Sequence, residues 1–115
     1  MSRFVLLLIL AACSTPSDAP APAPSAAAKE IFDSRCAACH GREGKGDGPA
    51  SASLAPRPRD FHDKGWQRQI TDEHIERIIR LGGSSVGKSA SMPANPDLSP
   101  PVIAALRELI RNYGQ

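Results

Sequence analysis

Aromatic residues, cysteine and net charge are all scarce in this sequence of 115 residues. Only 4% of the residues are aromatic, three are cysteine, two are methionine, and the formal charge is +2. A charge this small gives no strong basic field, which argues against nucleic-acid binding. The length allows a single domain with one core, which argues against a multidomain enzyme.

Long hydrophobic runs are also missing. The run from Phe4 to Leu10 is far shorter than the about 20 apolar residues of a membrane-spanning helix, so a permanent transmembrane anchor is not expected. It follows the positive Arg3 and precedes two alanines, which predicts an export signal over residues 1–12. The string from Leu10 to Cys13 resembles the lipobox of bacterial lipoproteins, in which cleavage leaves a lipidated cysteine as the first residue. The alternative is an ordinary signal peptide with an incidental Cys13.

The segment after Cys13 is rich in proline and alanine up to residue 28. Alternating Ala-Pro favours extended polyproline geometry, so this linker would reach roughly 45 Å at about 3.1 Å per residue. We expect residues 13–28 to tether a small domain, residues 29–115, to a membrane surface on the periplasmic side.

Helical signals dominate that domain. We expect one helix over about residues 27–38, a second after the N-cap Thr71 and before Gly82, and a third after the cap Ser99 with Pro100 in its first turn. Glycines predict a loop over residues 41–49, and prolines argue against long elements over residues 51–69. No stretch alternates as a strand. The prediction is an all-α domain of about three to four helices with long loops.

Such a small domain has few large apolar residues to bury, so it needs an insert such as a disulfide, a metal or a prosthetic group. The motif from Cys36 to His40, Cys-x-x-Cys-His, is the pattern for covalent attachment of a c-type haem. The two thiols would add to the two haem vinyl groups, and His40 would bind the iron. A thioredoxin-like pair lacks its βαβ context here, and a disulfide would close only a tiny loop. A zinc site needs four ligands, and His40 directly after Cys39 is poorly placed to bind one metal together with both cysteines.

A second iron ligand is also predicted. Met92 is the only methionine that remains after signal cleavage, and it lies in a polar loop after Gly82 and Gly83. A thioether ligand raises the reduction potential relative to two imidazoles. His62 and His74 are the other conceivable ligands, but their polar surroundings favour ordinary surface positions.

With these motifs, residues 28–113 resemble a class I monohaem cytochrome c. The resemblance rests on Phe32, on the Cys36-to-His40 motif, on the loop ending at Pro49, on the Met92-Pro93 pair and on the final helix after Leu98. It implies a cytochrome c fold wrapped around one covalent haem.

The resemblance also implies roles for single residues. Cys36 and Cys39 would form the thioethers, and His40 and Met92 would be the axial ligands. Pro49 would offer its carbonyl to the second nitrogen of His40. Phe32 would cross the last helix near Leu106 and Leu109, where the family often has an aromatic residue at the position of Leu109. Three further residues would lie beside the haem propionates: Arg57, Arg59 and Trp66.

The function implied is one-electron transfer between redox protein partners by a monomeric, lipid-anchored carrier. With both axial positions filled, no small-molecule substrate reaches the iron, so an enzyme is not expected. If Met92 does not bind, the alternative is a haem enzyme or a gas sensor with an open iron site. A third alternative is a lipoprotein without haem.

Overall fold

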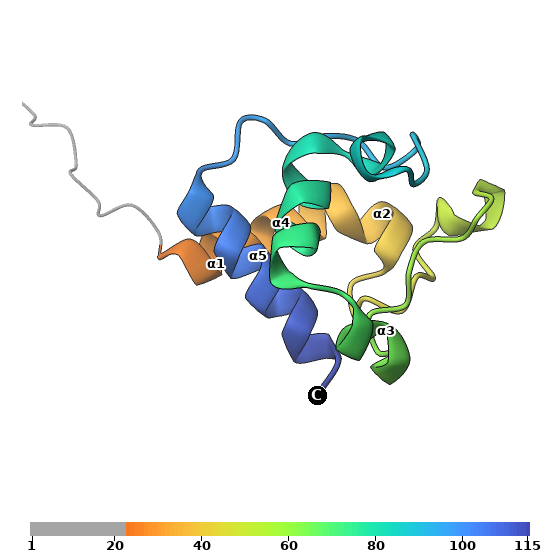
Figure 1. Ribbon diagram of the computed structural model, residues 1–115, viewed down its shortest axis with the longest axis horizontal. Helices are drawn as coiled ribbons and strands as arrows, with labels where there is room; N and C mark the ends of the chain where they lie inside the picture. The colour runs from red at the N-terminus through yellow and green to blue at the C-terminus, as the bar shows by residue number, and fades with distance from the viewer. Residues whose placement is uncertain (1–22) are drawn as a thin grey trace, which may run out of the picture.

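The computed structural model describes residues 23–115 and contains no strand in that range (Figure 1). The α-helices are α1 (Pro24–Ile31), α2 (Ala37–His40), α3 (Lys64–Gln69), α4 (Asp72–Leu81) and α5 (Pro100–Tyr113). The remaining turns are the π-helix η1 (Phe32–Cys36) and the 3-10 helices η2 (Ser51–Ser53) and η3 (Gly83–Val86). The predicted all-α class is confirmed. The predicted signal, Cys13 and the linker up to residue 22 lie outside the described residues.

The first helix begins at Pro24, earlier than the sequence suggests. Proline fits the first helical turn because its fixed φ suits the helix and its missing N–H would have no partner there. Three alanines follow, which are the best helix formers, and Ala28 is buried in the core. The predicted boundary between linker and domain is therefore corrected, because residues 24–28 belong to the folded domain.

A π-turn interrupts this helical run directly before the cysteine motif. Over Phe32–Cys36 the backbone is wound with five-residue spacing, and the N–H of Ala37 donates to the carbonyl of Phe32. Such turns occur mostly as single insertions in α-helices, often at functional sites. The turn connects the core residue Phe32 to Cys36 with a geometry that helical periodicity does not predict.

Helix α4 follows its local signals closely. The Thr71 hydroxyl accepts a hydrogen bond from the N–H of His74 at 3.2 Å, which caps the N-terminus. Gly82 ends the helix with φ of +83°, a conformation that side chains disfavour. Ile75 and Ile79 form its buried face. Both predicted ends of this helix are confirmed.

Helix α5 lies across α1 and closes the core (Figure 1). It begins after Ser99, as predicted, although the Ser99 side chain makes no capping hydrogen bond. Phe32 and Leu106 are the two large side chains that are completely buried. The aromatic partner of Phe32 on this helix is Tyr113, with ring centroids 5.5 Å apart. The aromatic contact missing at Leu109 is thus supplied one turn later.

The short helix α3 is present where the sequence predicted no long element. Asp63 caps it, since its carboxylate accepts from the N–H of Trp66 at 3.0 Å. No helix in residues 23–115 has the length and apolar character needed to cross a membrane.

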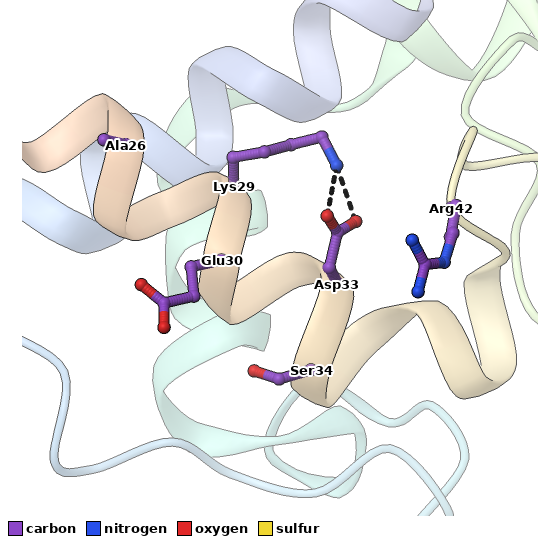
Figure 2. A pocket seen from close by; sticks show the side chains of 6 residues that line it. All are labelled: Ala26, Lys29, Glu30, Asp33, Ser34 and Arg42. Atoms are coloured by element: carbon purple, nitrogen blue, oxygen red, sulfur yellow. Dashed lines mark hydrogen bonds and ion pairs between the residues drawn. The ribbon is translucent and has the colours of Figure 1, made fainter.

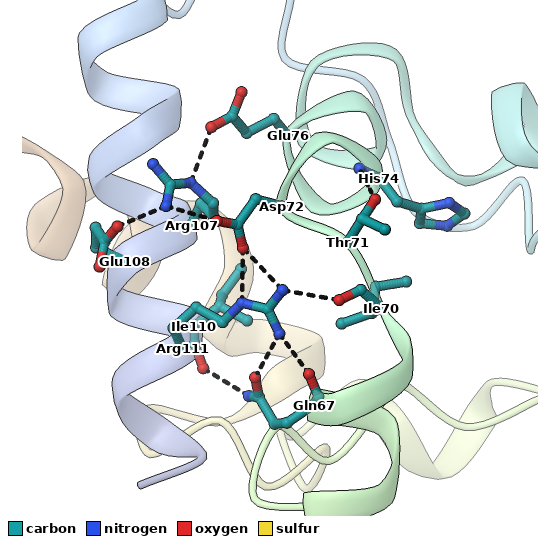
Figure 3. Close-up of polar contacts among 10 residues, drawn as sticks. All are labelled: Gln67, Ile70, Thr71, Asp72, His74, Glu76, Arg107, Glu108, Ile110 and Arg111. Carbon is teal, nitrogen blue, oxygen red and sulfur yellow. Dashed lines mark hydrogen bonds and ion pairs between the residues drawn. The ribbon is translucent and has the colours of Figure 1, made fainter.

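Two arginines of α5 connect α5 to α4 through a polar network (Figure 3). Arg107 donates to Asp72 and Glu76 at 3.0 and 2.9 Å, and Arg111 donates to Asp72 at 2.8 Å. The hydrogen bond from Arg111 and the charge of Arg107 hold the pKa of Asp72 below its usual value. Asp72 therefore stabilises the fold in its ionised form.

Replacing Asp72 by asparagine should make the free energy of unfolding fall less steeply as the pH is lowered. A carboxyl group with a lowered pKa contributes stability above its usual pKa and loses it as pH falls through the lowered value. Because Asp72 is partly exposed, solvent screening limits the loss at neutral pH to roughly 1 kcal/mol. The free energy of unfolding, measured from about pH 7 to about pH 3, should converge for wild type and variant at the acid end.

Glu73→Gln is the matched control, because it removes a neighbouring carboxylate on the same turn. We expect this variant to keep the wild-type pH dependence. Parallel curves for wild type and Asp72→Asn down to the acid end would show that the network contributes nothing through ionised Asp72.

Candidate metal centre

The glycine-rich loop that follows the cysteine motif forms hydrogen bonds to the backbone of the turn that carries the motif. Every backbone carbonyl from residue 37 to residue 40 accepts a hydrogen bond from that loop. The donors are the N–H groups of Gly41, Gly46, Gly48 and Ala50, at 2.7 to 3.1 Å. Buried carbonyls at a helix end need such partners, so the loop fixes the position of the motif.

Glycine is required where the loop touches the turn most closely. A Cβ placed on Gly48 would overlap the carbonyl oxygens of Ala37 and Ala38. The predicted loop over residues 41–49 is therefore more than a connection, because its missing side chains allow backbone to pack on backbone.

Cys36 and Cys39 are free thiols and both are half-buried. Before haem is attached, burial raises the pKa of the Cys36 thiol to about 11. Within residues 23–115 there is no cluster of three or more side chains that could hold a metal ion without a further cofactor.

The His40 imidazole is fixed on two sides. Its Nδ1 lies 3.2 Å from the carbonyl oxygen of Arg59, and its ring stacks on Phe61 with centroids 4.6 Å apart. Burial lowers the pKa of His40, although the bond to Arg59 opposes the shift, so the ring is held neutral. A proton on Nδ1 that is donated to Arg59 leaves the lone pair of Nε2 for a metal.

This contact corrects the role predicted for Pro49, because the structure places the carbonyl of Arg59 at Nδ1. The reason lies in Gly46, whose N–H donates to the carbonyl of His40 at 2.7 Å. A Cβ on Gly46 would lie 2.5 Å from the oxygen of Pro58, so only glycine lets the chain before Arg59 come this close. Pro49 itself is exposed in the loop.

Met92 is half-buried in the loop between η3 and α5. Its carbonyl accepts from the N–H of Gly83 at 3.1 Å, and the Asn95 side chain donates to the carbonyl of Ile79 at 3.0 Å. A Cβ on Gly83 would lie 3.3 Å from the Met92 side chain. The Met92 loop is therefore folded back onto the end of α4.

A forked ion pair joins the same loop to the cysteine turn. Arg35, the neighbour of Cys36, donates to both carboxylate oxygens of Asp97 at 3.0 and 2.8 Å and approaches Asn95 at 3.4 Å. These partners follow Met92 closely in sequence. The cysteine motif and the Met92 loop are thus held at one place in the fold.

Of the three residues predicted beside the haem propionates, the structure brings two together. The Arg59 guanidinium lies 5.9 Å from the centre of the Trp66 ring and 3.7 Å from Asp63. Arg57 is exposed.

The other two histidines occupy different environments. His62 is exposed, as expected, and its Nε2 lies 2.7 Å from the carbonyl of Glu43. His74 is half-buried, which differs from the expected surface position. Its Nε2 is shielded from solvent without a hydrogen-bond partner in the described residues.

Two surface hollows of the described chain lie away from the cysteine motif. One hollow, of about 660 Å³, lies on α1 and η1. Figure 2 shows the side chains that line it, among them Lys29, which donates to Asp33 at 2.6 and 2.5 Å. The other, of about 450 Å³, lies between α4 and η3 beside His74. No residue of the cysteine motif and no predicted axial ligand lines either hollow.

The side chains present fit a covalently attached haem. Two free thiols on one turn, an imidazole with an available Nε2 and a thioether on an adjoining loop are the groups that hold such a haem and its iron. An all-α domain with this donor set is a c-type haem protein. The sequence profile described as cytochrome c matches residues 25–113, and the chain belongs to the cytochrome c family. Its cofactor is one haem c, bound covalently through Cys36 and Cys39.

Two solved structures support the same assignment. The structure of the c-type cytochrome KustC0563 matches with a TM-score of 0.62 and 25% identity, over 76% of this chain and 98% of that chain. A chain of the Kuenenia stuttgartiensis reducing HAO-like protein complex Kustc0457/Kustc0458 matches with a TM-score of 0.59 and 28% identity. That match covers 75% of this chain and 40% of the other. No curated protein matches the chain.

Proposed function

We propose that the protein is a membrane-tethered carrier that passes single electrons between redox protein partners, with His40 and Met92 as the two axial iron ligands. Haem-based electron transfer follows from membership of the cytochrome c family. The axial pair, the tether and the absence of enzymatic turnover are the parts that we add.

The observation that carries the axial pair is the link between the cysteine turn and the Met92 loop. Arg35 binds Asp97 through both carboxylate oxygens, and the N–H of Gly83 holds the carbonyl of Met92. These contacts join the turn that carries the cysteine motif to the loop that carries Met92. We infer from this link that the half-buried thioether of Met92 is the second iron ligand.

The protein's own residues favour electron transfer over catalysis. Haem iron supplies a one-electron couple, and filling both axial positions denies a substrate access to the metal. Arg59 and Phe61 hold the His40 ring, while Gly83 and Asn95 hold the loop that carries Met92. Little rearrangement is then needed between the two oxidation states. We further propose that Arg57, Arg59 and Trp66 pair with the haem propionates.

The proposed location rests on the N-terminal residues. An export signal over residues 1–12 and a lipidated Cys13 would anchor the protein on the periplasmic side of a membrane. A proline- and alanine-rich tether up to about residue 23 would let the monomeric domain move between a donor and an acceptor protein.

Replacing Met92 by alanine tests the ligand assignment. We expect the variant to keep its covalent haem, to lose the red absorption band of thioether-to-ferric-iron charge transfer, and to show a lower reduction potential. Absorption spectra and redox titration of wild type and variant, purified from a strain competent in haem attachment, provide the measurement.

Ser91→Ala is the matched control, since it changes the neighbouring residue of the same loop without removing a thioether. The charge-transfer band and the reduction potential of this variant should stay as in wild type. A Met92→Ala variant with an unchanged spectrum would reject Met92 as ligand. Ready binding of carbon monoxide by the wild-type protein would favour the open-site alternative, a haem enzyme or gas sensor.

A further inference from the structure

We propose that Gln67 is a positioning residue for His40, because it anchors the segment whose backbone and side chains hold the imidazole. The inference concerns a residue to which no family motif points. It rests on the proposed function only in so far as His40 binds the iron.

The Gln67 side chain uses both of its N–H donors and accepts one further hydrogen bond. Its amide nitrogen donates to the carbonyls of Phe61 and Ile110 at 2.8 and 2.9 Å, and its oxygen accepts from Arg111 at 3.0 Å. An amide group has two N–H donors, and both are committed here. Figure 3 shows Gln67 between α5 and the segment that precedes α4. The side chain is therefore fixed in one orientation.

Arg111 locks Gln67 from the other side. Its guanidinium donates to the backbone carbonyls of Gln67 and Ile70 at 2.7 and 2.8 Å, and to Asp72 at 2.8 Å (Figure 3). The carbonyls at the C-terminal end of α3 are thereby satisfied by a half-buried charge. Gln67 thus has a rigid base on α5 from which to hold Phe61.

The connection from Gln67 to His40 passes through Phe61. The carbonyl of Phe61 is held by Gln67, and its N–H donates to the carbonyl of Gly44 at 2.8 Å. With both backbone groups fixed, the Phe61 ring stays stacked on His40, with the ring planes 16° apart. Arg59 lies two residues earlier on the same fixed segment, and its carbonyl faces Nδ1 of His40.

This arrangement gives Gln67 an electronic effect at a distance. A carbonyl that accepts from Nδ1 raises the basicity of the imidazole, and a more basic ligand favours the ferric state. When Gln67 is lost, the segment from Arg59 to Phe61 loses one of its anchors and the Nδ1 hydrogen bond weakens. The iron should then be easier to reduce.

Gln67→Ala in the haem-loaded protein is the test, with Gln69→Ala as matched control on the same helix. Gln69 is exposed at the C-terminal end of α3. We expect Gln67→Ala to shift the reduction equilibrium about threefold toward the ferrous state, which is ~28 mV at 59 mV per tenfold for one electron. The proton resonance of His40 Nδ1–H in the ferrous protein should move upfield, and Gln69→Ala should change neither value.

A second variant covers the case in which Gln67→Ala does not fold. Gln67→Glu can still accept from Arg111 but cannot donate to Phe61, and Gln69→Glu introduces the same charge nearby. We expect the Nδ1–H resonance to move upfield in Gln67→Glu and not in Gln69→Glu. Both variants add one negative charge, so the difference between their reduction potentials measures the effect of the lost hydrogen bond alone.

Two results would overturn the inference, and they are distinguishable. If Gln67→Ala lowers the thermal midpoint but leaves the potential and the Nδ1–H resonance in place, Gln67 is only a structural link between α3 and α5. If the ferrous wild type lacks haem-shifted His40 resonances, His40 is not an iron ligand. The proposed axial pair then fails together with the inference.

Discussion

Replacing Phe32 by alanine is expected to cost about 3–5 kcal/mol of folding stability, a large fraction of the total for a domain of this size. Phe32 is 1% exposed and packs beside the equally buried Leu106 where α1 and α5 meet. Its ring also contacts Tyr113, so one substitution removes contacts to two turns of α5. The free energy of unfolding of the haem-loaded protein, from guanidinium titration followed by circular dichroism, measures the loss.

Leu81→Ala is the control for this prediction. Leu81 is 48% exposed at the end of α4, and removing an exposed side chain should change stability by no more than about 0.5 kcal/mol. A loss below about 1 kcal/mol for Phe32→Ala would contradict the assignment of Phe32 to the centre of the core.

The elements that the sequence predicts well are those with signals inside the element itself. Helix α4 has a threonine cap, isoleucines on one face and a glycine stop, and both of its ends agree with the prediction. Helix α5 begins at a proline after Ser99 for the same kind of reason. The sequence places the start of the first helix too late, because alternating Ala-Pro indicates an extended chain. Burial of Ala28 against the core then favours helix for the last residues of that segment.

The residues of the site also differ in how well the sequence predicts them. Cys36, Cys39 and His40 are adjacent in sequence, so their joint chemistry is legible from spacing alone. The carbonyl partner of His40 comes from elsewhere in the chain, and the resemblance to known cytochromes pointed to Pro49 where the structure has Arg59. The Arg35–Asp97 pair and the bonds of Gln67 also join distant residues. Single-sequence patterns contain no signal for such pairs, because their partners meet only after folding.

The sequence predicts the glycine-rich loop only in part. Its composition predicts a loop, but only the structure shows which glycines are required for packing and which for backbone conformation. Gly48 in this loop has no space for a side chain. Gly87, which follows η3 outside the loop, has a φ of +71° and no atom within 4 Å of its missing Cβ, so it provides the contrast. The pair allows the two requirements to be separated by experiment.

Replacing Gly48 by alanine should therefore destabilise the site strongly, by about 3 kcal/mol or more, from steric overlap and lost hydrogen bonds. The added methyl group would overlap the carbonyl oxygens of Ala37 and Ala38, which are backbone atoms and cannot rotate away. The loop would have to withdraw, and the hydrogen bond from the N–H of Gly48 to Cys39 would break. Thermal unfolding and the yield of covalent haem, measured by pyridine haemochrome assay, should both fall.

Gly87→Ala supplies the comparison, because it adds the same methyl group where only the backbone conformation resists. We expect that variant to lose about 1–2 kcal/mol, the usual cost of a side chain in the left-handed region, and to keep its haem yield. If Gly48→Ala is as stable and as fully loaded with haem as Gly87→Ala, close packing of the loop on the cysteine turn does not hold the haem-binding motif. The support of Cys36, Cys39 and His40 would then have to come from the contacts of α1 and the Arg59 segment alone.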